Sequence, residues 1–529
     1  MMRRNSILAL GILLAVACEP VDTPVPPAPP AGGENDSTIV DSDSTVTDND
    51  STIMDNDSTV VMPDVPVDTD SLGLSAMDIT FNPADETAYT ELPEEVVTDD
   101  THDDYGDFVE NYRPTSTITV TYDGDKATVS GGVSGVLSKV TGAHVVIQST
   151  KKNIAYLLKG STADGSFKLS SNNKTQITLQ GVSITNPSGA AINIQSGKTM
   201  LMVLADGTAS YLEDGASYEF TLPNGEQQKG ALFSEGQLVF SGDGSLEVKS
   251  NCGHGIASDD YVRVRSGHIT VNSVRDGINT NDRFVMYGGT VNVTAQQDGI
   301  DIGKGYIEIG GGRLDVTAVD EGITASYEGE DDGSVDPLIA PYIAIKGGLV
   351  KVATTGDKGH ALRAMSTLSM SGGIVQATVK GAGSKALLSE SGMALTGGKV
   401  TAITEGGALY EEGELSSSAA IRSKGELQIT GMVVGVKSTG PGSKGINNVG
   451  NIVMDDSSVK VVATGTDYAY NGEEAYCYGV STDGTLSVSA GTLLVKTTHT
   501  PIKAASEQLS EKATYAAVTT ETAEGGIGK

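Results

Sequence analysis

Three carboxylates recur in this chain at an interval that could bring them into one column. Asp276, Asp298 and Glu321 each stand immediately before the Gly of a Gly-Ile step, and successive members are 22 and 23 residues apart. A repeat of this length fits one coil of a parallel β-solenoid and is too short for a propeller blade or a helical pair. Coils stack about 4.8 Å apart, so equivalent side chains lie one above another. The spacing therefore predicts a column of like charges.

Stacked carboxylates repel one another unless a cation lies between them. More oxygen ligands follow each Gly-Ile step in register, and Ca²⁺, which takes 6–8 oxygens, suits such a set. The predicted calcium ligands are Asp259, Asp260, Asp276, Asn279, Asn281, Asp282, Asp298, Asp301 and Glu321. The alternative is that Asp-Gly is only a common turn dipeptide and that these acids face water.

Short runs rich in β-branched residues, separated by Gly, fill residues 113–505. Residues 117–121 (TITVT), for example, alternate polar and apolar positions as half-buried strands do. Gly pairs recur where new strands begin, because Gly adopts positive φ freely. We therefore predict an all-β fold, a right-handed parallel β-helix of about ten coils over residues 113–505, followed by a polar tail at 506–529. An immunoglobulin-like sandwich is the alternative, but it does not predict a 22-residue period.

The first 112 residues differ in composition from the rest. Residues 1–18 resemble a lipoprotein signal peptide, with Arg3 and Arg4 before an apolar run that ends at Cys18, the expected lipidation site. Residues 19–112 are acidic and rich in Pro, Asp, Ser and Thr, so we expect a disordered tether. The net charge of −33 argues against nucleic acid as a partner. We expect a monomer, lipid-anchored in the cell envelope at the outer membrane or cell surface.

Cysteine usage is low. Besides Cys18 the chain contains only Cys252 and Cys477, which are more than 200 residues apart. A fold stapled by disulfides is therefore excluded, and the domain must hold together by burial of apolar surface. The sequence leaves open whether Cys252 and Cys477 pair.

Three insertions interrupt the repeat, at residues 326–337, 405–418 and 465–478. The first is rich in Asp and Glu, the second contains Tyr410 and several Glu, and the third contains four Tyr. All three lie next to a Gly-Ile step, so we expect them to project from one corner of the solenoid beside the acidic column. Ligands commonly bind where loops gather on a rigid scaffold, so this corner is the predicted functional face.

The middle third of the chain resembles a known family. The residues that carry the resemblance are FSEGQ at 233–237, CGHGIASDD at 252–260, DGINTND at 276–282, DGI at 298–300 and EGITASYEG at 321–329. These motifs are similar to those of the bacterial carbohydrate-binding β-helix lipoproteins, whose fold is like that of pectate lyases. The resemblance implies a non-catalytic, surface-tethered protein that binds cellulose or acidic pectic polysaccharide, with Ca²⁺ between its coils.

Carbohydrate recognition in this chain must do without Trp, of which there is none. A flat stacking surface for sugar rings would have to come from Tyr, and the insertions supply Tyr410, Tyr468, Tyr470 and Tyr476. Ordinary loop packing is the other explanation for these rings. Calcium that bridges to uronate carboxylates would recognise an acidic glycan without stacking, which favours a pectin-like ligand.

Two other functions remain open at this stage. A calcium-dependent polysaccharide lyase would need a base for the proton at C5, and Arg275 and Lys304 stand near the acidic column. A structural surface protein or adhesin would have the same tether and solenoid without affinity for sugar. Gly253-His254-Gly255 resembles an element of polygalacturonases, but the order of the accompanying elements is reversed here, which argues against hydrolysis.

Overall fold

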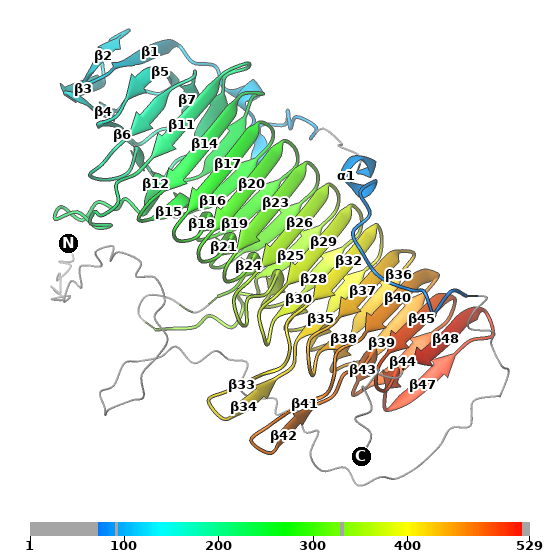
Figure 1. Ribbon diagram of the computed structural model, residues 1–529. Helices are drawn as coiled ribbons and strands as arrows, with labels where there is room; N and C mark the ends of the chain where they lie inside the picture. Colours follow the sequence, from blue (N-terminus) through cyan, green and yellow to red (C-terminus); the bar gives the residue numbers. More distant parts are fainter. Residues whose placement is uncertain (1–71, 90–93, 328, 330–332, 521–529) are drawn as a thin grey trace, which may run out of the picture.

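The computed structural model describes residues 72–89, 94–327, 329 and 333–520, which form a long parallel β-solenoid (Figure 1). The predicted signal peptide, Cys18 and tether residues 19–71 lie outside the described residues. Among the residues described, no helix is long and apolar enough to cross a membrane. The prediction of a nearly all-β fold with large parallel sheets is confirmed.

Each regular coil contributes one strand to each of three faces, which we number in chain order. Face 1 is the 15-stranded sheet. Its strands are β3 (Val136–Thr141), β4 (Ala143–Ser149), β6 (Gly165–Ser171), β9 (Ile192–Gln195), β12 (Gly230–Ser234), β15 (His254–Ser258), β18 (Ile278–Thr280), β21 (Ile300–Ile302), β24 (Ile323–Ala325), β27 (Leu362–Ala364), β30 (Lys385–Ser389), β35 (Ala419–Ser423), β38 (Lys444–Asn448), β43 (Val480–Thr482) and β46 (Ile502–Lys503).

The 29-stranded sheet supplies the other two faces. Face 2 contains β1 (Ser116–Asp123), β2 (Lys126–Ser130), β5 (Ile154–Thr162), β7 (Thr175–Leu179), β10 (Met200–Leu204), β13 (Leu238–Ser241), β16 (Tyr261–Val264), β19 (Arg283–Met286), β22 (Tyr306–Ile309), β25 (Tyr342–Ile345), β28 (Leu368–Met370), β31 (Met393–Leu395), β36 (Leu427–Thr430), β39 (Ile452–Asp455), β44 (Thr485–Val488) and β47 (Ser506–Leu509). Face 3 contains β8 (Ser183–Thr185), β11 (Ala209–Glu213), β14 (Ser245–Ser250), β17 (His268–Ser273), β20 (Thr290–Ala295), β23 (Arg313–Ala318), β26 (Leu349–Thr354), β29 (Ile374–Val379), β32 (Lys399–Thr404), β37 (Val433–Ser438), β40 (Ser457–Ala463), β45 (Gly491–Thr497) and β48 (Ala513–Thr519).

The solenoid is longer than the sequence predicted. In face 1 only β3 pairs antiparallel, and the fourteen strands from β4 to β46 are parallel, which is more than the ten coils expected. The boundary predicted at residue 505 is also wrong. Strand β47 pairs with β44 and β48 pairs with β45, so the sheet continues to Thr519 where a polar tail was expected. The sequence did not reveal β47 and β48 because many of their residues are polar. In a terminal coil only the side that faces the core needs to be apolar.

Apolar side chains stack inside the solenoid from coil to coil. Ile256, Ile278, Ile300 and Ile323 pair in register and are at most 1% exposed. The Gly before each Ile is required by space, since a Cβ on Gly277 would lie 2.1 Å from Cγ1 of a neighbouring valine. The recurring Gly-Ile step is therefore a packing requirement of the coil.

A segment expected to be disordered lies along the outside of the solenoid. We call residues 72–89 and 94–112 the strap; it contains α1 (Asp85–Ala88) and the 3-10 helices η1 (Asp103–Asp107) and η2 (Val109–Asn111) (Figure 1). Its beginning packs Leu74 against Val462 and Leu494 at the C-terminal end of the solenoid. Its end packs Tyr112 against Leu201. The strap thus runs antiparallel to the stacking of the coils, and the prediction of disorder over 19–112 is wrong for these residues.

Acidic residues of the strap pair with cations of the solenoid over most of its length. The cations are Arg263, Arg265, Arg283, Arg313, Lys351, Lys399 and Lys437. These pairs explain why a strongly acidic segment is ordered: its charges are matched by basic residues more than 150 positions away in the sequence.

The structure also answers whether Cys252 and Cys477 form a disulfide. Cys477 is a buried free thiol and so does not pair with Cys252.

Candidate functional site

The predicted column of carboxylates exists on face 1. The register of β15, β18, β21 and β24 places Asp276 beside Asp298 and Asp298 beside Glu321 in consecutive coils. His254 occupies the same position one coil earlier, and His360 one coil later. Asp276 and Glu321 are 7% and 8% exposed. The stacking prediction is therefore confirmed, and we call Asp276, Asp298 and Glu321 the acidic column.

Each carboxylate of the acidic column binds the backbone of the next coil. Oδ1 of Asp276 accepts the N–H of Asp298 at 3.2 Å, and Oδ1 of Asp298 accepts the N–H of Glu321 at 2.8 Å. Oε2 of Glu321 accepts the N–H of His360 at 2.8 Å. One oxygen of every column carboxylate is thus used to join neighbouring coils, which is a structural role independent of any ligand.

The members of the column have different affinities for protons. Burial raises the pKa of Asp298 well above its usual value, and the charges of Asp276 and Asp301 raise it further. Burial also raises the pKa of Glu321 to about 7, although the Arg363 guanidinium at 3.2 Å opposes this. The pKa of Asp276 is below its usual value: burial works against ionisation there, but the imidazole Nδ1 of His254 lies 3.1 Å from Oδ2. The protonated form is therefore favoured at Asp298 and Glu321, and the ionised form at Asp276.

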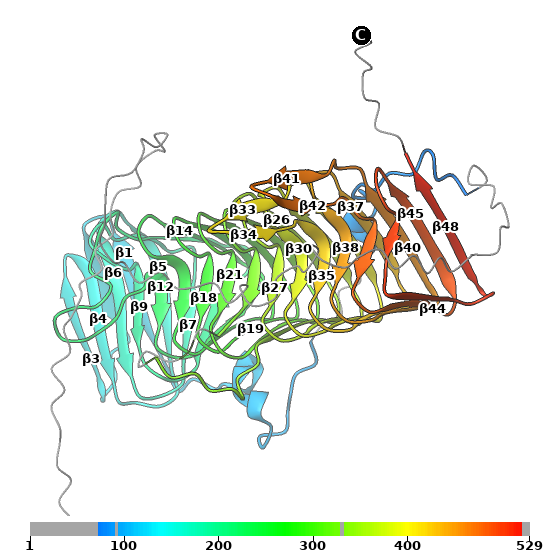
Figure 2. The ribbon, with the colours of Figure 1, turned by 90° about the horizontal axis from the view of Figure 1, so that it is seen from below.

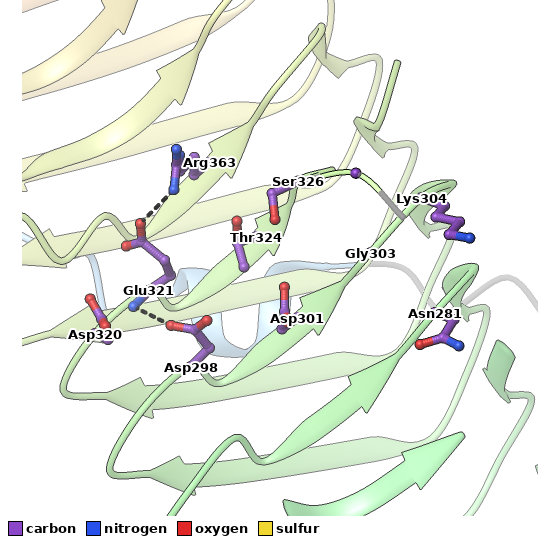
Figure 3. A pocket seen from close by; sticks show the side chains of 11 residues that line it. Asn281, Asp298, Asp301, Gly303, Lys304, Asp320, Glu321, Thr324, Ser326 and Arg363 are labelled. Carbon is purple, nitrogen blue, oxygen red and sulfur yellow. Dashed lines mark hydrogen bonds and ion pairs between the residues drawn. The ribbon is translucent and has the colours of Figure 1, made fainter. Parts of the chain in front are cut away.

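These two residues line a pocket of about 450 Å³ that crosses the width of face 1. Figure 3 shows Asp298, Asp320 and Glu321 at one side of this pocket, and Lys304 and Asn281 at the other. We call it the face 1 pocket; its complete lining is Asn281, Asp298, Asp301, Gly303, Lys304, Asp320, Glu321, Thr324, Ser326, Gly329 and Arg363. Four carboxylates and two cations thus converge on one depression.

The donor chemistry of the pocket fits a hard cation such as Ca²⁺. Carboxylate oxygens are the ligands that Ca²⁺ prefers, and Thr324 adds a hydroxyl that is buried without a hydrogen-bond partner, the residue being 2% exposed. Across the described residues, however, no group of three or more His, Cys, Asp or Glu forms a cluster that could hold a metal ion. A bound Ca²⁺ would therefore need oxygens from a ligand or from water to complete its shell.

The nine predicted calcium ligands do not form one group. Asn279 joins two of them, because its Nδ2 donates to Asp276 Oδ2 at 2.9 Å and to Asp301 Oδ2 at 3.1 Å. Asp259 and Asp260 lie at the opposite ends of the strands, where Asp259 pairs with Lys229 at 2.6 Å. Asp259 and Asp260 come three and four residues after Ile256, beyond the end of strand β15, whereas the column residues come just before the Gly-Ile step. The length of a face 1 strand therefore separates these two positions from the column.

The same separation applies to the next coil. The backbone N–H of Asp282 donates to the carbonyl of Asp260 at 2.8 Å, so Asp282 lies with Asp260 at that far edge. Only Asn281, of the four predicted ligands there, reaches the face 1 pocket. The expectation that these carboxylates share one site is wrong for Asp259, Asp260 and Asp282.

The two predicted cations have different surroundings. Lys304 lines the face 1 pocket. The guanidinium of Arg275 instead lies 4.8 Å from the ring centroid of Phe220, in the insertion that follows β11. Of the two, only Lys304 is positioned to meet a ligand in the pocket.

The predicted tyrosines gather further along the solenoid. Two antiparallel hairpins, β33 (Leu409–Glu411) with β34 (Glu414–Ser416) and β41 (Tyr468–Tyr470) with β42 (Glu473–Ala475), stand side by side (Figures 1 and 2). The rings of Tyr410 and Tyr470 are 5.2 Å apart, and Asn471 Nδ2 donates to Tyr410 Oη at 2.7 Å. Tyr476 stacks on His499 with centroids 5.4 Å apart.

The acidic insertion, the first of the three, does not join these hairpins. Residues 326–337 follow strand β24, whereas the hairpins precede β35 and β43, so the acidic insertion and the hairpins leave face 1 from opposite ends of its strands. The prediction that all three insertions share one corner is therefore wrong. The tyrosine group and the face 1 pocket are separate places on the same face.

Among the residues of the pocket that sequence reasoning missed are Asp320, Thr324 and Arg363. Thr324 and Arg363 pair in register with Asp301, each being the second residue after the Gly position of its coil. The signal was present in the repeat itself, but the insertion between β24 and β27 obscured the alignment of Arg363.

Comparison with known proteins identifies the family. Residues 141–414, more than half of the chain, match the family described as carbohydrate-binding domain-containing protein. The chain belongs to this family. A carbohydrate-binding domain-containing protein of Acetivibrio thermocellus is 31% identical over 118 residues, which are 22% of this chain and 41% of the relative's length.

A solved structure is also similar to this carbohydrate-binding domain protein. The polysaccharide lyase-like protein from C. thermocellum, in a gadolinium derivative, is 25% identical and covers 50% of this chain and 90% of its own. Its TM-score is 0.38.

Proposed function

We propose that this chain is a non-catalytic binding protein for acidic polysaccharide, with Ca²⁺ held in the face 1 pocket between protein and sugar carboxylates. The family match supports carbohydrate binding. The observation that carries the proposal is the convergence of four carboxylates, an unpartnered Thr324 hydroxyl and Lys304 on one pocket. An anionic ligand could approach such a site only with a cation to offset the repulsion.

The acidic column then has two roles on the same residues. Its backbone hydrogen bonds hold neighbouring coils in register, and two of its members, Asp298 and Glu321, also line the pocket with Asp301 and Asp320. Bound Ca²⁺ would supply positive charge to a uronate carboxylate and complete its own shell with the oxygens of the ligand. Burial, and after it the charges of Asp276 and Asp301, raise the pKa of Asp298, and a neighbouring cation would favour its ionised form.

A calcium-dependent lyase is the second candidate, and the position of Lys304 favours it. In such a reaction a base removes the proton at C5 of a uronate, the electron pair forms the C4–C5 double bond, and the glycosidic oxygen at C4 leaves. Lys304 lines the pocket and could act as the base, whereas Arg275 lies outside it.

One experiment separates these functions. The purified domain is incubated with polygalacturonate, with Ca²⁺ or with a chelator, and both retention on the polymer and ultraviolet absorbance of unsaturated product are followed. The proposal predicts calcium-dependent retention without product. Product that disappears in Lys304→Ala would establish the lyase, and absence of retention in any condition would leave a structural surface protein or adhesin.

Matched variants locate the site. Asp298→Asn and Asp301→Asn remove charge from the pocket with little change in volume, and retention in Ca²⁺ should fall at least tenfold. Asp123→Asn is the control, because Asp123 is an exposed carboxylate at the end of β1, far along the chain from the pocket. Equal retention by all three variants would show that Ca²⁺ at this pocket takes no part in binding the polymer.

We also propose that the chain is lipid-anchored at Cys18 in the cell envelope, so that the solenoid presents its ligand face at a membrane surface. The proposal derives from the signal-like sequence that ends at Cys18. Incorporation of labelled palmitate into the wild type, and its absence in Cys18→Ser, would test the anchor directly.

A further inference from the structure

The outward-facing side chains of face 1 change in chemical type along the solenoid. In each coil the residue after the Gly-Ile step, or its equivalent, points away from the core, and the register stacks these residues into an outer file. From β18 to β46 the outer file reads Asn279, Asp301, Thr324, Arg363, Leu388, Arg422, Asn447, Ser481 and Lys503. The first part contains oxygen acceptors, and the last part contains hydrogen-bond donors.

We call Arg422, Asn447, Ser481 and Lys503 the donor file. Arg422 is half-buried, and its guanidinium has no ion-pair partner within the part of the chain that the structure describes. Asn447, in the next coil, is 5% exposed, and its Nδ2 is buried without a hydrogen-bond partner. A buried amide that lacks a partner is costly, so its presence beside a cation points to an acceptor that comes from outside.

The surroundings of the donor file are cationic and aromatic. Tyr478 follows Lys444 in the file that continues the acidic column, and the ammonium groups of Lys444 and Lys503 lie 5.8 and 5.3 Å from its ring centroid. The hairpin β41–β42 emerges directly before Tyr478, which places Tyr476 and its stacking partner His499 at the margin. Positive charge is thus held over several coils by an aromatic support.

We propose that the donor file is a second saccharide subsite, which binds a uronate carboxylate directly, without a metal ion. Arg422 would supply guanidinium donors to the carboxylate, and Asn447 Nδ2 would donate to the same group from the adjacent coil. Arg422 lies four coils beyond Asp301, or roughly 19 Å at about 4.8 Å per coil. Leu388, which lies between them in the outer file, is 2% exposed, so the two sites would contact separate segments of an anionic polymer.

This inference rests on the proposed function and adds to it a specific chemistry. A site that depends only on Ca²⁺ would release the polymer completely in chelator. With the donor file, part of the affinity for an acidic polymer is independent of calcium, and the carboxylates of the ligand are essential for that part. A neutral polymer would gain nothing from these donors.

The test compares polygalacturonate with carboxyl-reduced polygalacturonate, each in Ca²⁺ and in chelator, by affinity electrophoresis of the whole chain. Arg422→Ala and Asn447→Asp are expected to weaken binding of the acidic polymer about tenfold or more in chelator, with binding of the reduced polymer unchanged. Lys460→Ala is the matched control: it removes one exposed positive charge from β40 on face 3. Circular dichroism and melting temperature establish that each variant is folded.

The outcomes distinguish the two proposals. If the wild type binds the acidic polymer in chelator, and Arg422→Ala and Asn447→Asp bind it equally well in chelator, the proposed role of the donor file is wrong. The proposal for the face 1 pocket is unaffected by that result. If the wild type binds no acidic polymer under any condition, the proposed function fails and the subsite fails with it. If Lys460→Ala weakens binding as much as Arg422→Ala, the attraction is general charge and the site assignment is wrong.

Discussion

Replacing Arg263 by alanine removes the cation that holds the end of the strap. Arg263 comes from β16 and is 4% exposed. Its guanidinium pairs with Glu94, with Asp104 at 3.2 Å and with Asp107 at 3.1 Å. Its charge also lies 5.5 Å from the ring centroid of Phe108. Arg263 thus contacts more acidic residues of this part of the strap than its neighbours Arg265, which pairs with Glu94 and Glu110, and Arg283, which pairs with Asp104.

The size of the effect follows from burial. Breaking a buried pair by removing one partner costs about 3–5 kcal/mol, because the other charge is left uncompensated. Glu94 retains Arg265 at 3.0 Å, so the lower end of that range applies, and Asp107 loses its cation in a site where burial already raises its pKa. We expect the opening of this part of the strap to become about 3 kcal/mol easier, which is roughly a hundredfold in its equilibrium constant.

Amide hydrogen exchange followed by mass spectrometry measures this opening directly. Peptides that cover residues 94–112 should exchange much faster in Arg263→Ala, while peptides from faces 1 and 3 keep the wild-type rate, because local openings need not unfold the solenoid. Arg313→Ala is the control. Its pair with Glu86 is about a quarter to a third exposed on each side, and such pairs contribute less than about 1 kcal/mol.

Unchanged exchange of residues 94–112 in Arg263→Ala would refute the reasoning. It would mean that apolar contacts such as Tyr112 with Leu201 hold the strap, and that the charges only accompany them. Equal acceleration in Arg263→Ala and Arg313→Ala would also contradict the argument, because burial would then not determine the cost of breaking a pair.

Two further predictions concern face 1. Since the pKa of Glu321 is raised to about 7 from 4.5, the folded chain binds this proton more tightly than the unfolded chain, and stability at this site falls as pH rises from about 4.5 to 7. Melting temperature against pH should therefore decline more steeply for the wild type than for Glu321→Gln, and parallel curves would contradict the assignment. Gly277→Ala would place a Cβ 2.7 Å from the carbonyl oxygen of Gly299 and should cost about 1–3 kcal/mol. Denaturant midpoints compare it with Gly197→Ala, where nothing lies within 4 Å of the new Cβ, and equal midpoints would show that the coil can yield.

The repeat period was enough to predict the solenoid and its acidic column. A 22-residue interval fixes which residues are equivalent, and stacking then brings Asp276, Asp298 and Glu321 together whatever the rest of the chain does. The same regularity predicted the Gly corners, where Gly289 and Gly312 have φ of 76° and 80°. The right-handed sense of the solenoid and the role of Ca²⁺ stay predictions.

Features that depend on distant parts of the chain could not be read from the period. Asp85 pairs with Lys399 at 2.8 Å across more than 300 residues, and an acidic composition alone favoured disorder there. Asp259 and Asp260 have the same residue types as the acidic column, but the width of a strand separates them from it. Local sequence determined the coil, because each coil repeats the same short-range packing. Only the tertiary structure decided what covers the solenoid and which polar groups share a pocket, because those contacts join residues whose spacing follows no repeat.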